Sequence, residues 1–313
     1  MNEFELIDAF VATFDAPPPP LGPGDDCAVL PPGRATICVT TDALVEGVHF
    51  TRRTFRFEDV GHKALAVNLS DLAAMGARPT WALCALGLPA DVTARDVKAL
   101  GRGMAALARV HRVALVGGNV TRSLQLTVTV TAAGEVPRGR RALLRSGARP
   151  GDVVYASGFL GDAALGLELL TARRPVPRAL AQAQRRPAPH LAWALCAAPF
   201  ASAAIDVSDG LVQDLGHVCR ASRVGVDLDG EALPISPALR GAVSFERARR
   251  LALTGGEDYV VVATVPERRA EAFERAMARG GFDAHRLGRV SSVRGVRVDG
   301  RPHRGPGGFQ HVR

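Results

Sequence analysis

Residues 62–79 read HKALAVNLSDLAAMGARP and form the longest helical pattern in the N-terminal half of the sequence. Three leucines recur at intervals of four and three, and alanines and a valine fill the other faces, so this helix is predicted to be buried nearly all round. Asp71 lies inside it. A buried carboxylate has to be paired, used as a helix cap or bound to a metal, because its desolvation alone is costly. The segment by itself leaves open whether Asp71 binds a metal or whether Ser70 or Asp71 caps a second helix after a break at Asn68.

The composition bounds the class of protein. A chain of 313 residues with 47% hydrophobic residues can bury a sizeable core and is long enough for two domains. The sequence holds no run of 18 apolar residues, and its first residues, MNEFE, are acidic where a secretory signal would be basic and then apolar. We therefore expect a cytoplasmic protein with no membrane partner.

The five cysteines are widely separated and odd in number, with no C-x-x-C pair, which argues against a disulfide framework and against a zinc site. The net charge of +8 invites a nucleic-acid interpretation, yet the arginines are scattered and aromatic residues make up only 5% of the chain. Small molecules that carry phosphate suit a basic protein equally well. We expect no nucleic-acid partner.

Hydrophobic periodicity and turn signals predict a mixed α/β fold. An Arg-, Gly- and Pro-rich segment at 137–150 is interpreted as a linker, which gives an N-terminal domain at 1–148 and a C-terminal α/β domain at 149–313. Helices are predicted at 2–14, 62–79, 93–109, 163–170, 211–221 and 267–279, and strands at 36–42, 80–88, 113–116, 124–133, 153–157, 259–265, 287–290 and 296–298.

A set of acidic residues shares one context, because each lies in or beside an apolar or glycine-rich segment. Its members are Asp25, Asp26, Asp42, Asp71, Asp206, Asp209, Glu257 and Asp258. Several such carboxylates with flanking Ser and Thr hydroxyls suggest an all-oxygen site for Mg²⁺, and Mg²⁺ usually completes its shell with water and phosphate oxygens. The sequence contains no P-loop and no protein-kinase motif. The residues alone therefore indicate a magnesium-dependent nucleotide enzyme of two α/β domains.

Six motifs in this order and spacing resemble the thiamine-monophosphate kinases. They are GDDCA at 24–28, TTD at 40–42, KALAVNLSDLAAMGA at 63–77, RSGA at 145–148, DVSDGL at 206–211 and GGEDY at 255–259. This family shares a superfamily with aminoimidazole ribonucleotide synthetase and selenophosphate synthetase. The resemblance implies an N-terminal half-barrel domain that a second subunit completes, hence a homodimer, and a C-terminal α/β domain. It also implies transfer of the γ-phosphoryl group of ATP to thiamine monophosphate, the last step in making thiamine diphosphate.

The resemblance further implies roles for single residues. Several magnesium ions would be held by Asp26, Thr41, Asp42, Asp71, Asp206 and Asp209. ATP would be contacted by Gly118, Asn119, Arg145 and Ser208, and thiamine monophosphate by His49, Glu257 and Phe309. Direct in-line transfer between two phosphates needs charge neutralisation and alignment more than proton transfer, so no catalytic side chain is expected.

One position departs from the family pattern. Where the family has Gly-Gly-Asp-Thr, this sequence has GGNV at 117–120, so that Asn119 replaces a metal-binding carboxylate by a neutral amide. We expect a weaker metal position there. The departure keeps two alternatives open, namely another ATP-dependent synthetase of the same superfamily and a weakly active nucleotide-binding homologue.

Overall fold

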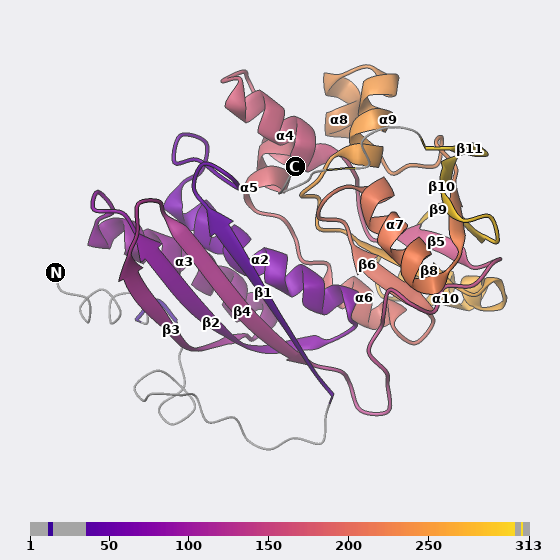
Figure 1. The fold of residues 1–313 in the computed structure, drawn as a ribbon, viewed down its shortest axis with the longest axis horizontal. Helices are drawn as coiled ribbons and strands as arrows, with labels where there is room; N and C mark the ends of the chain where they lie inside the picture. Colours follow the sequence, from indigo (N-terminus) through magenta and orange to yellow (C-terminus); the bar gives the residue numbers. More distant parts are fainter. Residues whose placement is uncertain (1–11, 15–35, 304–307, 309–313) are drawn as a thin grey trace. The chain divides into compact units, whose positions relative to one another are not determined.

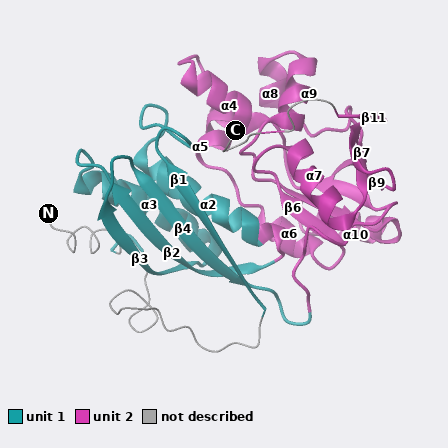
Figure 2. Ribbon diagram, viewed as in Figure 1, with its two compact units in different colours: residues 1–72, 77–139 teal, residues 73–76, 140–313 magenta. Residues whose placement is uncertain are grey.

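The computed structural model describes residues 12–14, 36–303 and 308 and divides the chain into two compact units (Figure 2). Unit 1 comprises Met1–Leu72 and Ala77–Gly139, and unit 2 comprises Ala73–Gly76 and Arg140–Arg313. The predicted mixed α/β class is confirmed. Residues 140–148, which the sequence analysis placed in the N-terminal domain, group with unit 2. The predicted helix at 2–14 lies outside the described residues, apart from a turn at 12–14.

Unit 1 is built on a four-stranded sheet with the order β1-β4-β2-β3. Pairs β1/β4 and β4/β2 are antiparallel, and β2/β3 is parallel. Two helices, α2 and α3, lie on one face of this sheet in Figure 1. The strands are β1 (Ile37–Val45), β2 (Arg78–Leu88), β3 (Ala114–Arg122) and β4 (Thr127–Glu135), and the helices are α2 (Phe57–Ala74) and α3 (Ala94–His111).

Helix α2 is the helix predicted from the opening stretch. It runs without a break from Phe57 to Ala74, and within it the side-chain amide of Asn68 donates to the carbonyl of Ala64 at 2.9 Å. The alternative in which Ser70 or Asp71 caps a second helix is therefore wrong. The helix is buried nearly all round, as its apolar pattern predicts. Arg78, which the opening stretch included, begins β2 instead.

Two glycines let α2 and α3 approach closely. A Cβ placed on Gly61 would lie 2.0 Å from the carbonyl oxygen of Leu100, and one placed on Gly103 would lie 1.8 Å from the carbonyl oxygen of Glu58. Each helix thus contributes a glycine where the backbone of the other passes. This close packing fixes α2, and with it Asp71, within unit 1.

Helix α3 begins where the sequence predicts. The Thr93 hydroxyl accepts a hydrogen bond from the backbone N–H of Asp96, and the Asp96 carboxylate accepts one from the backbone N–H of Thr93. This reciprocal pair satisfies two N–H groups that a helix start would otherwise leave without partners.

Unit 2 is built on a seven-stranded sheet with the order β11-β10-β7-β9-β5-β8-β6, in which only β10/β7 is parallel. Its strands are β5 (Val153–Ala156), β6 (Ala203–Asp206), β7 (Gly225–Leu228), β8 (Val261–Val265), β9 (His285–Ser291), β10 (Gly295–Val298) and β11 (Arg301–Pro302). Its helices are α4 (Asp162–Thr171), α5 (Arg178–Arg185), α6 (Leu191–Ala197), α7 (Leu211–Ser222), α8 (Pro237–Ala242), α9 (Phe245–Thr254) and α10 (Glu267–Arg279).

Helix α10 has the bounds predicted from the sequence, and α4 and α7 match their predicted bounds within one residue at each end, but α5, α6, α8 and α9 are not predicted. Those four are six to ten residues long. Helices this short gain most of their stability from tertiary packing. No helix in the described part of the chain is long and apolar enough to cross a membrane.

The close contact between α2 and α3 predicts how a substitution at Gly103 changes the stability of the protein. Gly103→Ala should lower the unfolding free energy by about 2 kcal/mol or more, although alanine favours a helix over glycine by about 1 kcal/mol, because the new methyl group collides with backbone. Gly241→Ala in α8 is the matched control, since no atom lies within 4 Å of its Cβ position. Urea unfolding of both variants checks this, and a Gly103→Ala variant as stable as the control would contradict the packing argument.

Candidate functional site

Unit 1 brings two of the predicted metal ligands together. Asp42 on β1 and Asp71 on α2 interact through their side chains, and the Thr40 hydroxyl donates to Asp71 Oδ2 at 2.5 Å. Desolvation, the charge of Asp71 and the hydrogen bond to Asp71 raise the pKa of Asp42 to about 7. Two carboxylates this close cannot both ionise without a compensating positive charge. The pair is therefore suited to holding a proton or a cation.

Thr41, the neighbouring predicted ligand, points to the other face of the sheet. Its hydroxyl donates to the carbonyl of Val130 at 3.2 Å and accepts from the Thr131 hydroxyl at 3.0 Å. The hydroxyl beside the carboxylate pair belongs to Thr40 instead. The alternation of a strand could have identified it, because residues 40 and 42 share a face.

Gly118 and Asn119 lie on β3, at the edge of the sheet opposite β1. Asp42 and Gly118 stand at the two ends of one row of paired residues that crosses the sheet. A Cβ on Gly118 would lie 1.9 Å from the carbonyl oxygen of Cys84, so this position requires glycine. Asn119 is exposed and pairs with Ala85 in the next row, on the opposite face. Two strands separate β3 from β1, a distance of about 14 Å at ordinary strand spacing. Unit 1 thus does not gather Asn119 with Asp42 and Asp71.

His49 follows β1 in a tight turn. The backbone N–H of Val45 donates to His49 Nδ1 at 3.1 Å, and the N–H of His49 donates to the carbonyl of Val45 at 2.9 Å. Because Nδ1 accepts, we assign the ring proton of a neutral imidazole to Nε2. Asp26 and Phe309, the remaining predicted site residues of the two termini, lie outside the described residues.

In unit 2 a buried carboxylate that the sequence analysis did not single out shapes the DVSDG loop. Asp214 Oδ2 accepts the backbone N–H groups of Ser208, Asp209 and Gly210 at 3.0–3.1 Å. Burial raises the pKa of Asp214 to about 7, against these hydrogen bonds. Its place in the first turn of α7, where acids favour a helix N-terminus, is the signal that could have found it.

The GGED segment packs directly against this loop. The N–H of Glu257 donates to the carbonyl of Ser208 at 2.7 Å, and that of Tyr259 donates to the carbonyl of Val207 at 2.8 Å. A Cβ on Gly256 would lie 2.7 Å from the Ser208 carbonyl oxygen, which explains the glycine. Ser208 and Glu257, predicted separately for ATP and for thiamine monophosphate, are therefore held side by side.

The same loop carries both predicted metal ligands of unit 2. Asp206 is buried at the end of β6, and Asp209 Oδ2 accepts from Gln213 Nε2 at 2.9 Å. Arg145, the other predicted ATP contact, is tied to the end of α7, because the Ser222 hydroxyl donates to its carbonyl at 2.9 Å. That hydroxyl also accepts the N–H groups of Gly147 and Ala148.

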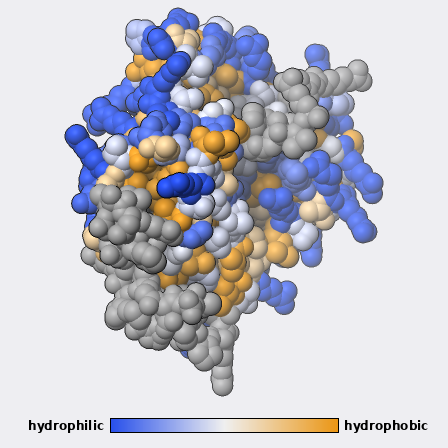
Figure 3. All heavy atoms as spheres, turned by 60° about the vertical axis from the view of Figure 1, so that its left-hand side comes forward, coloured by the Kyte–Doolittle hydropathy of each residue, from blue (hydrophilic) through white to orange (hydrophobic). Residues whose placement is uncertain are grey.

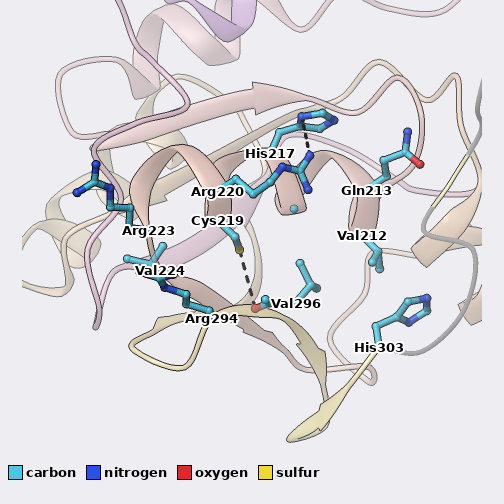
Figure 4. Close-up of a pocket in the computed structure, with 12 residues that line it drawn as sticks. Val212, Gln213, His217, Cys219, Arg220, Arg223, Val224, Arg294, Val296 and His303 are labelled. Atoms are coloured by element: carbon cyan, nitrogen blue, oxygen red, sulfur yellow. Dashed lines mark hydrogen bonds between the residues drawn. The ribbon is translucent and has the colours of Figure 1, made fainter.

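A basic groove of about 670 Å³ runs along α7 and β10 in unit 2 (Figure 4). Arg220, Arg223 and Arg294 line it together with His217 and His303, and valines form its apolar part. Arg220 is fixed by donating to His217 Nδ1 at 2.9 Å. A groove with this lining attracts anions such as phosphates. Gln213, which holds Asp209, lies on its wall, so the groove begins beside a predicted metal ligand.

The donor set suits magnesium. Within the described ranges no three His, Cys, Asp or Glu side chains gather into a metal site by themselves. Mg²⁺ does not require such a cage, since it binds through one or two carboxylates and takes its other ligands from water and substrate phosphates. The oxygen-only pair Asp42–Asp71, whose charges repel, fits one such position.

Comparison with known proteins adds independent findings. Residues 24–136 match the family described as AIR synthase related protein, N-terminal domain, and residues 149–301 match its C-terminal domain. A thiamine-monophosphate kinase of Salmonella typhimurium is 43% identical over 277 residues, which is 87% of this chain and 84% of the relative. One of Aquifex aeolicus is 36% identical over 317 residues and covers 99% of this chain and 98% of the relative.

Solved structures agree. The thiamine-monophosphate kinase of Stenotrophomonas maltophilia K279a is similar with a TM-score of 0.87 and 40% identity, over 97% of this chain and 98% of that one. AaThiL complexed with AMPPCP and TMP gives a TM-score of 0.80 and 35% identity, over 99% and 97%. The hydrogenase maturation protein HypE of E. coli, at 23% identity and a TM-score of 0.80, shows the shared fold alone.

The GGED segment makes a prediction about pH. Asp258 accepts the N–H groups of Gly161 and Ala163 at 2.6 and 3.2 Å, and desolvation raises its pKa to about 8. Between about pH 4 and 8 the folded chain then holds one proton more than the unfolded chain. The contribution of this group to stability is thus complete below pH 4 and falls by up to about 1.4 kcal/mol per pH unit until pH 8.

Asp258→Asn removes this titration and keeps the size of the side chain. The difference in unfolding free energy between wild type and variant should therefore shrink from pH 5 to pH 8 and level off above pH 8. Urea unfolding at four pH values measures it. Parallel pH profiles for the two proteins would show that the carboxyl group is ionised throughout.

Proposed function

We propose, because the chain belongs to the AIR synthase related family and within it to the thiamine-monophosphate kinases, that it transfers the γ-phosphoryl group of ATP to thiamine monophosphate. The products are thiamine diphosphate and ADP. The observation that carries the proposal is the packing of the DVSDG loop against the GGED segment, where the Glu257 N–H donates to the Ser208 carbonyl. It joins a residue expected to contact ATP to one expected to contact thiamine monophosphate. A relative of the same fold and length that is complexed with AMPPCP and TMP supports this assignment.

In this proposal several magnesium ions are held by carboxylate oxygens of Asp26, Asp42, Asp71, Asp206 and Asp209, whereas the hydroxyl of Thr41 faces away from the Asp42–Asp71 pair. Bound magnesium supplies charge neutralisation and Lewis-acid polarisation of phosphate oxygens. The raised pKa of Asp42 supports a cation position at the Asp42–Asp71 pair, because a cation relieves the repulsion that otherwise retains a proton there.

The remaining residues bind and orient the two substrates. ATP is contacted by Gly118, Asn119, Arg145 and Ser208, and thiamine monophosphate by His49, Glu257 and Phe309. The Glu257 carboxylate complements the positive charge of the thiazolium ring. An ionised phosphate oxygen is already a nucleophile, so in-line transfer needs alignment of acceptor and leaving group rather than a side-chain base.

Two alternatives to this function are another synthetase activity of the superfamily and a weakly active nucleotide-binding homologue. Other members of the superfamily share the fold, as HypE does, but the similarity to HypE does not extend to its activity. A weakly active homologue is motivated by Asn119, which offers a carbonyl oxygen and no charge.

A direct assay separates these alternatives. The purified chain with ATP, Mg²⁺ and thiamine monophosphate should form thiamine diphosphate and ADP, measured by chromatography. Asp71→Asn should lower kcat roughly 100-fold or more, because it removes a charged metal ligand while keeping the side-chain size. Asp91→Asn, at an exposed ion pair with Arg52, is the control and should keep wild-type turnover. Failure of the wild type to form thiamine diphosphate would refute the proposed function.

We also propose that the chain forms a homodimer through the face of the unit 1 sheet that α2 and α3 leave uncovered. On β1, Ile37 and Val39 are 49% and 60% exposed and lie on this face with Thr41. Apolar surface gathers near the centre of the side turned forward in Figure 3. Exposed apolar side chains on a sheet face favour burial against a second sheet.

A charged side chain placed on this sheet face tests whether the face forms the dimer interface. Val39→Asp should weaken self-association about tenfold or more, because the interface would have to desolvate a carboxylate. Val110→Asp on α3, where the valine is 73% exposed, is the matched control. Sedimentation equilibrium measures both, and equal association of the two variants would place the interface elsewhere.

A further inference from the structure

A glutamine on α5 is buried in a way that its local sequence does not explain. Gln184 has a relative exposure of 0%, although it lies in the polar helix RALAQAQR. It is buried because α5 packs closely on α4, where a Cβ on Gly166 would lie 2.3 Å from the carbonyl oxygen of Leu180 and 3.2 Å from Gln184 Cβ. Burying an amide is unfavourable unless its hydrogen bonds are made, so this burial needs a reason.

The side chain of Gln184 reaches Glu257. Its Nε2 donates to Glu257 Oε2 at 2.6 Å, and its Oε1 has no hydrogen-bond partner among the described residues. A carboxylate oxygen only accepts, so the amide has to turn its N–H₂ group toward Glu257 even though Oε1 is thereby left unsatisfied. The hydrogen bond to Glu257 is therefore kept, while Oε1 of Gln184 goes without one.

The backbone around Glu257 is constrained at the same time. Glu257 has a φ of 69° and Tyr259 a φ of 52°, in the left-handed region that side chains other than glycine seldom adopt. The Glu257 N–H is held by the Ser208 carbonyl, and the next residue, Asp258, binds the N-terminal N–H groups of α4. Backbone strain of this kind persists where the surroundings impose it, often at functional sites. The hydrogen bond from Gln184 then restrains the Glu257 side chain, which the backbone leaves rotatable.

We propose that Gln184 is a positioning residue for substrate binding, which holds the half-buried Glu257 carboxylate in the orientation that receives the cationic organic part of the phosphate acceptor. The inference rests on the proposed function, because it assigns Glu257 to that acceptor. Gln184 acts through Glu257 and does not touch the transferred phosphoryl group. Its loss therefore affects binding of the acceptor and leaves binding of ATP intact.

The test compares kinetic constants. Gln184→Leu, which removes the donor at similar volume, should raise KM for thiamine monophosphate about tenfold, while kcat and KM for ATP change less than about threefold. Gln182→Leu on the exposed side of the same helix is the matched control and should leave all three constants unchanged. Gln184→Glu, which sets a second carboxylate against Glu257, should raise KM for thiamine monophosphate further. Thermal unfolding of each variant confirms that it is folded.

A double-mutant cycle separates positioning from a general structural effect. In a Glu257→Gln background the further change to Gln184→Leu should no longer raise KM for thiamine monophosphate, because the carboxylate that it positions is gone. Additive effects of the two substitutions, or a Gln184→Leu variant with the constants of the control, would overturn the inference while the proposed function stands. Absence of thiamine diphosphate formation by the wild type would overturn both.

Discussion

The burial of negative charge is the constraint on which this structure depends. Helix α2 is apolar nearly all round and packs within unit 1, so Asp71 is only partly exposed and meets Asp42 of β1. The glycine contacts between α2 and α3 hold α2 in place, because each Cβ position is filled by backbone of the other helix. The fold thus holds two carboxyl groups together that cannot both ionise without a cation between them. Such an arrangement costs stability, and it is useful to a protein that binds cations.

In unit 2, backbone N–H groups donate hydrogen bonds to the carboxyl groups that the fold removes from water. Asp214 and Asp258 are each surrounded by N–H donors, three for Asp214 and two for Asp258, and each shapes the segment that supplies them. These two carboxylates are structural. They orient the neighbouring acidic residues, Asp209 and Glu257, which remain accessible to ligands. In the GGED segment the two kinds of acid, Glu257 and Asp258, stand in adjacent positions, whereas Asp214 lies five residues after Asp209.

The chemistry proposed for the protein fits this division of labour. Phosphoryl transfer between two anions is limited by repulsion and alignment, so ligands for cations and rigid substrate contacts matter more than a nucleophilic side chain. The DVSDG loop and the GGED segment are linked by backbone hydrogen bonds, which fix Ser208 and Glu257 relative to each other. A basic groove beside Asp209 adds positive charge where phosphates would be attracted.

The sequence by itself determined the elements with strong local signals, and it predicts the chemistry of the motifs. Thr93 marks the start of α3 through its own cap, α10 has a clear helical period, and the acidic motifs indicate a magnesium-dependent nucleotide enzyme. The tertiary structure decided what depends on contacts between distant segments. Strand pairing turned Thr40 toward Asp71 and sent Asn119 to the opposite edge of the sheet. Gln184 meets Glu257 across 73 residues of sequence, and the short helix that carries it is stabilised by packing on α4. No local pattern encodes such contacts, because burial and register are set by the whole fold.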